Sequence, residues 1–289
     1  MKTVKTDRKV ITRSPHRKVG YINCRWFQNE RIEHESQLEK RFVQCALLCP
    51  RLLSIKSQPF KIQISKKSAY TPDFLLTFDD GSIIVVEVKI QAKVARNVEK
   101  FNIAHSMLKA KDFEFFVLTE LEIDRYRQSQ IAAEILRYAK SEFALPVMQS
   151  VMNKMANNVE KYISVRDLAQ LSDCSNEVIY HLIANRQLTL HPSDYLSAEA
   201  RVYIARNLDE TGKQVFANHF DVTAWVEQKS DISTPLVTAI GLRKRVKRTK
   251  VPYVRARTIK ANQPIPHPLN SLAGGLPQTI KFRRPGNAE

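Results

Sequence analysis

One tight turn constrains the fold of this chain more than any other feature of its sequence. Asp79-Asp80-Gly81 separates two largely apolar segments, residues 71–78 and 82–90. An Asp-Gly pair between such segments is the strongest short-range signal for a β-hairpin, so we expect the two segments to be antiparallel neighbours. The second segment contains the β-branched run Ile83-Ile84-Val85-Val86, which is typical of a buried central strand.

The segments around this hairpin predict an α/β core. Apolar residues at helical spacing predict helices over residues 35–49, 94–109 and 124–140. Polar–apolar alternation and a short apolar run predict further strands over residues 60–65 and 113–119. Helices and strands that alternate in this way indicate an α/β fold.

Charged residues lie at the open end of the predicted hairpin. Asp73 begins the first strand, and Glu87 and Lys89 end the second. Side chains at positions i and i+2 share one face of a strand, so Glu87 and Lys89 project together, and the hairpin can bring Asp73 beside them. Glu39, on the preceding helix, could add a carboxylate from above the sheet. Two carboxylates can hold one or two Mg²⁺ ions, and an ammonium can orient an attacking water or stabilise phosphorane-like charge.

A surface ion pair is the simpler interpretation of the Glu-x-Lys pattern. Such pairs are common on exposed strands and contribute about 0–1 kcal/mol. Here the pair follows four β-branched residues, at the end of a central strand where isolated charges are rare. We therefore favour a catalytic metal site that uses Mg²⁺, with Mn²⁺ as a substitute.

The net charge of +17 resides at the two ends of the chain. Residues 1–20 hold seven Lys/Arg and one acid, and residues 242–289 hold twelve Lys/Arg and one acid, so residues 21–241 are neutral. Basic arms attract a polyanion such as a nucleic acid, largely irrespective of its base sequence. They can also be solvated tails without a specific partner. The residues of the tail that we expect to bind DNA are Arg243, Lys244, Arg245, Lys247, Arg248 and Lys250.

A helix-turn-helix pattern follows Pro146. Ser164 is a predicted N-cap of a helix that ends near Leu171, and Ser175 is a predicted N-cap of a second helix. A strand at residues 188–190 could form a wing. The second helix carries few basic residues, so the pattern leaves DNA reading and protein binding equally open.

Several short motifs occur in a consistent order over residues 34–125. They are Ser36-Gln37-Leu38-Glu39, Ser57-Gln58-Pro59-Phe60, Tyr70-Thr71-Pro72-Asp73-Phe74-Leu75, Val86-Glu87-Val88-Lys89 and Phe116-Val117-Leu118-Thr119-Glu120. Together they resemble the TnsA family, the endonuclease subunits of heteromeric TnsABC-type transposases, within the PD-(D/E)xK superfamily. The resemblance implies a restriction-endonuclease-like core, a mixed sheet flanked by helices. The resemblance implies an active site of Glu39, Asp73, Glu87 and Lys89, with metal ligands at Asp73, Glu87, Val88 and Glu39.

The resemblance also implies partners. TnsA-like proteins cut double-stranded DNA at the 5′ ends of the transposon, whereas a TnsB-like DDE recombinase cuts and joins the 3′ ends. A TnsC-like AAA+ ATPase contacts the C-terminal part of the nuclease, and the outcome is cut-and-paste transposition. Two alternatives stay open: a free-standing restriction or repair nuclease, and a catalytically silent DNA-binding scaffold.

The expected organisation has four parts. A basic arm (residues 1–20) precedes a restriction-endonuclease-like core (21–145), a small winged-helix domain (146–210) and a weakly structured extension with a basic, disordered tail (211–289). No apolar run reaches the 18 residues of a membrane span, and the N-terminus lacks the apolar stretch of a secretory signal. These features predict a protein that is not associated with a membrane, and the resemblance implies the bacterial cytoplasm and association with the nucleoid.

Overall fold

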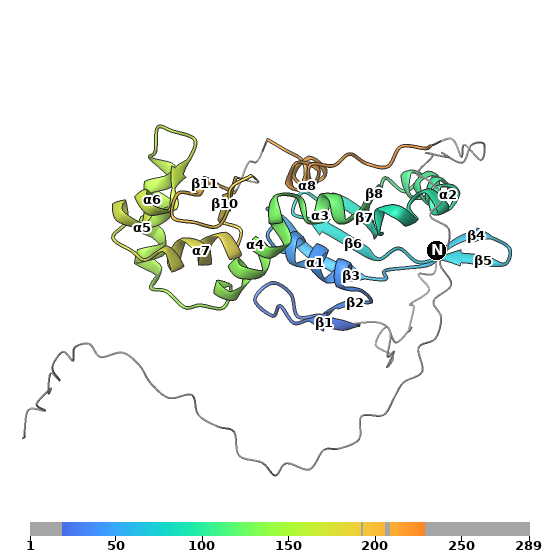
Figure 1. Cartoon of the computed structure of the whole chain (residues 1–289), viewed down its shortest axis with the longest axis horizontal. Helices are drawn as coiled ribbons and strands as arrows, with labels where there is room; N and C mark the ends of the chain where they lie inside the picture. Colours follow the sequence, from blue (N-terminus) through green and yellow to red (C-terminus); the bar gives the residue numbers. More distant parts are fainter. Residues whose placement is uncertain (1–18, 192, 206–208, 229–289) are drawn as a thin grey trace, which may run out of the picture. The chain divides into compact units, whose positions relative to one another are not determined.

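The computed structural model describes residues 19–191, 193–205 and 209–228 (Figure 1). Most of the N-terminal arm and the whole basic tail lie outside the described residues. This is also true of the six candidate DNA-binding residues, Arg243, Lys244, Arg245, Lys247, Arg248 and Lys250.

The central sheet has four strands in the order β3-β6-β7-β8. Their bounds are β3 (Leu52–Ser57), β6 (Phe74–Phe78), β7 (Ile83–Val88) and β8 (Glu114–Leu118). Strands β3, β6 and β7 are antiparallel neighbours, whereas β7 and β8 are parallel, so the sheet is mixed as expected. The predicted hairpin is confirmed: Phe74 pairs with Val86, and Gly81 in the turn has a φ of 82°, a conformation that favours glycine. Strand β3 is an addition that the alternation pattern did not predict.

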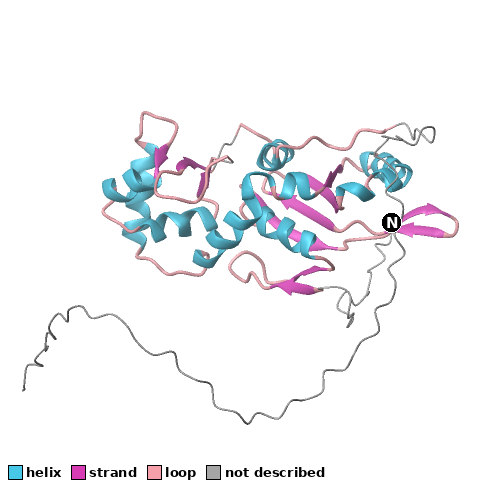
Figure 2. Ribbon diagram, in the orientation of Figure 1, coloured by secondary structure: helices cyan, strands magenta, loops and turns pink. Residues whose placement is uncertain are grey.

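Helices cover both faces of this sheet (Figure 2). Phe74, Leu76 and Val86 face a core shared with α1, whereas Val85 and Phe115 face a core shared with α2. The helices of this part are α1 (Gln37–Ala46), α2 (Val98–Lys109), α3 (Glu120–Ile123) and α4 (Gln128–Ile135), with 3₁₀ turns η1 (Gln91–Lys93), η2 (Ala95–Asn97), η3 (Arg125–Arg127) and η4 (Leu136–Tyr138).

All three helices predicted for this part differ from expectation. The helix expected over residues 94–109 is α-helical only from Val98, after a 3₁₀ turn. The helix expected over residues 35–49 is shorter at both ends, and the Ser36 side chain caps its start by accepting a hydrogen bond from Glu39 N. The helix expected over residues 124–140 is interrupted. Tyr126 and Arg127 have φ values of 50° and 59°, so the regular α-helix begins only at Gln128.

Two small hairpins flank the sheet. Strands β1 (Gly20–Ile22) and β2 (Ile32–His34) form one, and β4 (Ile62–Ser65) and β5 (Ser68–Tyr70) form the other. The second hairpin confirms the strand expected at residues 60–65. Its inward residues, Ile62 and Tyr70, pack into the α2 core, so the base of this hairpin is fixed close to Asp73.

The helix-turn-helix prediction is confirmed at the level of its elements. Helices α5 (Leu145–Ala156), α6 (Val165–Leu171) and α7 (Asn176–Ala184) pack with a sheet of order β10-β11-β9, formed by β9 (Ile163–Ser164), β10 (Leu188–Leu190) and β11 (Arg201–Ile204). Ser164 accepts a hydrogen bond from Asp167 N, as expected of an N-cap. Val165, Ile179 and Val202 belong to a core of this part of the chain.

Residues 209–228 correct the expectation of a weakly structured extension from residue 211. They contain α8 (Gly212–Phe220), in which Phe216 and Phe220 are buried in the core shared with α1. The helix approaches the sheet so closely that a Cβ at Gly212 would lie 2.4 Å from Phe78 Cβ. Beyond the helix, Trp225 N donates a hydrogen bond to the main-chain oxygen of Phe115 in β8. The buried side chains of α8, Val215, Phe216 and Phe220, span little more than one helical turn, so the helical period is weak in the sequence there.

None of the helices in the described part of the chain is long and apolar enough to cross a bilayer.

Candidate active site

Asp73 lies immediately before β6, opposite the end of β7. Its Oδ2 accepts a hydrogen bond of 2.8 Å from Val88 N, and its main-chain oxygen accepts one of 2.8 Å from Gln58 N. Burial, followed by the nearby carboxylates of Glu87 and Glu39, holds the pKa of Asp73 well above its usual range. The two strands therefore fix a carboxylate in a position where its negative charge is disfavoured.

Glu87 is the most deeply buried member of the predicted site, with only 2% of its surface exposed. Lys89 Nζ lies 2.7 Å from Glu87 Oε1, and the hydroxyl of Tyr70 donates a hydrogen bond of 2.6 Å to Glu87 Oε2. Both oxygens of the carboxylate are thus held by charged or polar partners, as a buried carboxylate requires.

The ammonium of Lys89 is stabilised by its neighbours. Partial burial alone would lower its pKa, but the carboxylates of Glu87, Asp73 and Glu39 outweigh that effect and raise it. Lys89 therefore stays protonated beside the carboxylates, which is the state needed to stabilise negative charge.

Glu39 comes into electrostatic reach of Asp73 and Lys89 from the first turn of α1. Its Oε2 accepts a hydrogen bond of 2.6 Å from Glu35 N, and its Oε1 accepts one of 2.8 Å from Ser36 Oγ. Burial raises its pKa. The structure therefore brings all four predicted catalytic residues together, but it engages the oxygens of Glu39 with the start of its own helix.

The donor set can be tested for a divalent cation. Within residues 19–191, 193–205 and 209–228, no cluster of three or more His, Cys, Asp or Glu side chains has the arrangement of a complete metal site. Asp73 and Glu87 nevertheless fit, because they are hard oxygen donors whose mutual repulsion a cation would relieve. Val88 could contribute only its main-chain oxygen, and Glu39 would have to leave its capping position.

Two residues near Glu87 were not predicted from the sequence. Tyr70 belongs to the motif that contains Asp73, but nothing in the sequence pairs its hydroxyl with Glu87. Lys100 lies on α2, with Nζ 3.8 Å from Glu87 Oε1 and 4.6 Å from the centre of the Tyr70 ring. A lysine within a helix carries no sequence signal for such a contact, so only the packing of α2 on the sheet reveals it.

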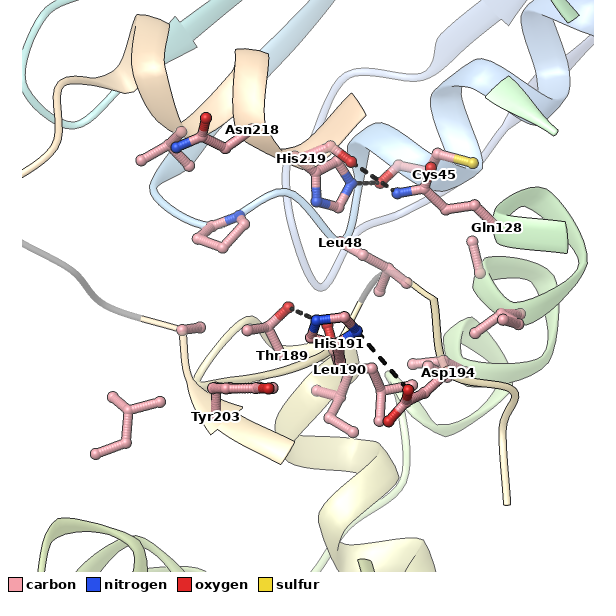
Figure 3. A pocket seen from close by; sticks show the side chains of 18 of the residues that line it. Cys45, Leu48, Gln128, Thr189, Leu190, His191, Asp194, Tyr203, Asn218 and His219 are labelled. Atoms are coloured by element: carbon pink, nitrogen blue, oxygen red, sulfur yellow. Dashed lines mark hydrogen bonds and ion pairs between the residues drawn. The ribbon is translucent and has the colours of Figure 1, made fainter. Parts of the chain in front are cut away.

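A separate hollow of about 500 Å³ is lined by none of the four predicted catalytic residues (Figure 3). Its wall includes residues of α1, α4, α8, β10 and β11. His219 Nε2 lies 3.0 Å from the main-chain oxygen of Cys45, and Gln128 Nε2 donates a hydrogen bond of 2.9 Å to the main-chain oxygen of His219. Burial lowers the pKa of His219 to about 4. The imidazole is therefore neutral at pH 7, and we assign it to packing.

A mixed sheet flanked by helices, with a carboxylate–lysine cluster at the open end of its central hairpin, fits a nuclease core. Residues 49–120 match the family model described as the TnsA-like endonuclease N-terminal domain. Residues 49–120 are thus similar to a TnsA-like endonuclease domain, and the resemblance drawn from the sequence is confirmed. A comparison with curated proteins gave no match. Asp73, Glu87 and Lys89 lie inside the matched stretch, whereas Glu39 precedes it.

Proposed function

We propose that this protein is the endonuclease subunit of a cut-and-paste transposase, and that it hydrolyses DNA at the 5′ ends of the transposon. The observation that carries the proposal is the contact set of Asp73, Glu87 and Lys89 inside the matched endonuclease domain. The site of action would be the bacterial nucleoid.

In this proposal Asp73 and Glu87 hold Mg²⁺, or Mn²⁺ in its place. When bound, the ion lowers the pKa of a coordinated water and neutralises charge on the phosphate. Lys89 is kept protonated by the surrounding carboxylates, so its ammonium can donate hydrogen bonds to the phosphate as negative charge develops there. The hydrogen bond from Val88 N keeps Asp73 oriented, which preserves the geometry between turnovers.

We propose that partners supply sequence specificity. Helix α7, the second helix of the helix-turn-helix, contains no lysine or arginine, and residues 21–241 are neutral. Phosphate contacts position a protein on DNA, but base contacts specify the sequence, so this body has few means to select a site alone. A TnsB-like DDE recombinase that reads the transposon ends would deliver the nuclease to the correct phosphate.

The C-terminal part has a separate proposed role. Helices α5, α6 and α7 with the sheet β10-β11-β9 support a winged-helix domain, here proposed to contact a TnsC-like AAA+ ATPase or the DNA next to the cut. The absence of lysine and arginine from α7 favours the protein contact.

The decisive experiment is cleavage of a labelled transposon end by the full chain in Mg²⁺, with and without the recombinase. We expect accurate 5′-strand cutting only when the recombinase is present, and none with an Asp73→Ala chain. Efficient, site-specific cutting by the chain alone would favour a free-standing restriction nuclease. A folded chain that never cuts, with or without its partners, would favour a catalytically silent scaffold.

A further inference from the structure

Two lysines from different elements approach the same carboxylate oxygen. Lys89, at the end of β7, places Nζ 2.7 Å from Glu87 Oε1, and Lys100, on α2, places Nζ 3.8 Å from that atom. The carboxylates of Asp73 and Glu39 lie near the same site, so a second ammonium contributes to its charge balance. It also approaches Glu87 from a different element than Lys89, and this gives the carboxylate a second positive contact.

Lys100 is held in place by aromatic rings and not only by charge. Its Nζ lies 4.6 Å from the centre of the Tyr70 ring and 4.9 Å from the centre of the Phe101 ring. Both rings are buried, so they restrict the lysine side chain, and ammonium–ring attraction is strengthened where water is scarce. Lys100 is thus directed at Glu87 by its surroundings.

Tyr70 links the two halves of this arrangement. Its hydroxyl donates to Glu87 Oε2, while its ring lies under the Lys100 ammonium. The carboxylate is consequently held on one oxygen from the β4–β5 hairpin and on the other from α2, independently of Lys89. If Lys89 turns towards a phosphate, these two contacts can keep Glu87 in its orientation.

We propose that Lys100 is a positioning residue of the nuclease: together with Tyr70 it fixes the Glu87 carboxylate and thereby releases Lys89 to act on the DNA. This inference rests on the proposed endonuclease function. Replacing a residue that orients a metal ligand commonly lowers metal affinity or activity by about 10–100-fold.

The test compares Lys100→Met, Lys100→Arg and Tyr70→Phe in the full chain with its recombinase partner. We expect Lys100→Met to lower kcat about tenfold with KM for DNA changed less than twofold, and Lys100→Arg to restore most of the loss. The double variant Tyr70→Phe/Lys100→Met should lose less than the product of the single losses, because both residues act through Glu87. Lys109→Met, which removes an exposed charge from the same helix, should behave as the unmodified chain.

Calorimetric titration with Mn²⁺ supplies a readout that needs no cleavage. Loss of Lys100 removes one of the contacts that orient the Glu87 carboxylate, so Lys100→Met should weaken Mn²⁺ binding and Lys100→Arg should restore most of it. A raised KM with unchanged kcat would make Lys100 a phosphate contact and overturn the inference, as would an unchanged kcat or an unchanged Mn²⁺ affinity of Lys100→Met. If the unmodified chain neither cuts DNA nor binds Mn²⁺ through Asp73, the proposed function itself fails, and the inference fails with it.

Discussion

Asp73 Oδ2 accepts a hydrogen bond of 2.8 Å from Val88 N, so a carboxylate side chain ties the start of β6 to the end of β7. This contact orients Asp73 at a place where burial and the carboxylates of Glu87 and Glu39 raise its pKa. The site therefore combines a favourable hydrogen bond with an unfavourable charge. Such a conflict is expected where a protein preserves a functional group at the expense of stability.

Replacing Asp73 by asparagine should stabilise the metal-free protein and abolish cleavage. The amide oxygen can still accept the hydrogen bond from Val88 N, while the disfavoured charge disappears. We expect the Tm in EDTA to rise by about 2–4 °C, which corresponds to roughly 1 kcal/mol for a folded region of this size. Differential scanning calorimetry and the cleavage assay measure the two effects.

The pH dependence provides the control for that variant. Asp73 has a raised pKa in the folded state, so its destabilising effect exists only while it is ionised and is relieved as the pH falls through that pKa. The Tm advantage of Asp73→Asn over the unmodified chain should therefore shrink on acidification. An asparagine variant that is less stable than the unmodified chain at pH 7 would contradict the electrostatic account.

Calcium should separate binding from chemistry. Ca²⁺ accepts oxygen ligands in looser geometry than Mg²⁺, so it should occupy the Asp73–Glu87 pair without positioning the reactants for hydrolysis. We expect the recombinase-dependent complex on DNA to form in Ca²⁺ with no strand cut, and cutting to begin when Mn²⁺ is added. Gel-shift and cleavage assays on one labelled DNA follow both steps, and cutting in Ca²⁺ alone would refute the expectation.

His219 should make the fold sensitive to acid. Its pKa is about 4 in the folded state, against about 6.5 in an unfolded chain, so the unfolded state binds the proton first as the pH falls. Stability should be lost progressively from pH 6.5 towards pH 4, by about 3 kcal/mol in all. Urea unfolding of the unmodified chain and of His219→Gln across this range isolates the effect, because every other group titrates in both. Parallel curves for the unmodified chain and His219→Gln would exclude His219 as the cause.

The basic tail should control non-specific DNA binding. Deleting residues 242–289 removes twelve Lys/Arg and one acid, so affinity should fall and the plot of log K against log salt should flatten by roughly 0.9 for each lost phosphate contact. Residues 261–280 contain no Lys, Arg, Asp or Glu, so their deletion shortens the tail at constant charge and should leave the slope unchanged. Fluorescence anisotropy at several salt concentrations measures both the DNA affinity and this slope. An unchanged slope after the full deletion would indicate that the tail docks to a protein partner instead.

Local signals in the sequence were sufficient for the central hairpin and for the grouping of Asp73, Glu87 and Lys89. A turn at Asp80-Gly81 defines strand pairing over a few residues, and the two-residue period of a strand then decides which side chains share a face. The same reasoning failed for the helix expected over residues 124–140, because the positive φ values at Tyr126 and Arg127 have no composition signal there.

The sequence by itself determined the central hairpin, the neutral body between basic ends, and the identity of the carboxylates and lysine at the open end of the hairpin. Only the tertiary structure decided what surrounds them: Tyr70 and Lys100 on Glu87, and α8 packed against Phe78. The physical reason is the distance along the chain over which each kind of interaction acts. Turn chemistry and strand period act between neighbours along the chain, whereas contacts between distant segments arise from the packing of side chains around a shared core.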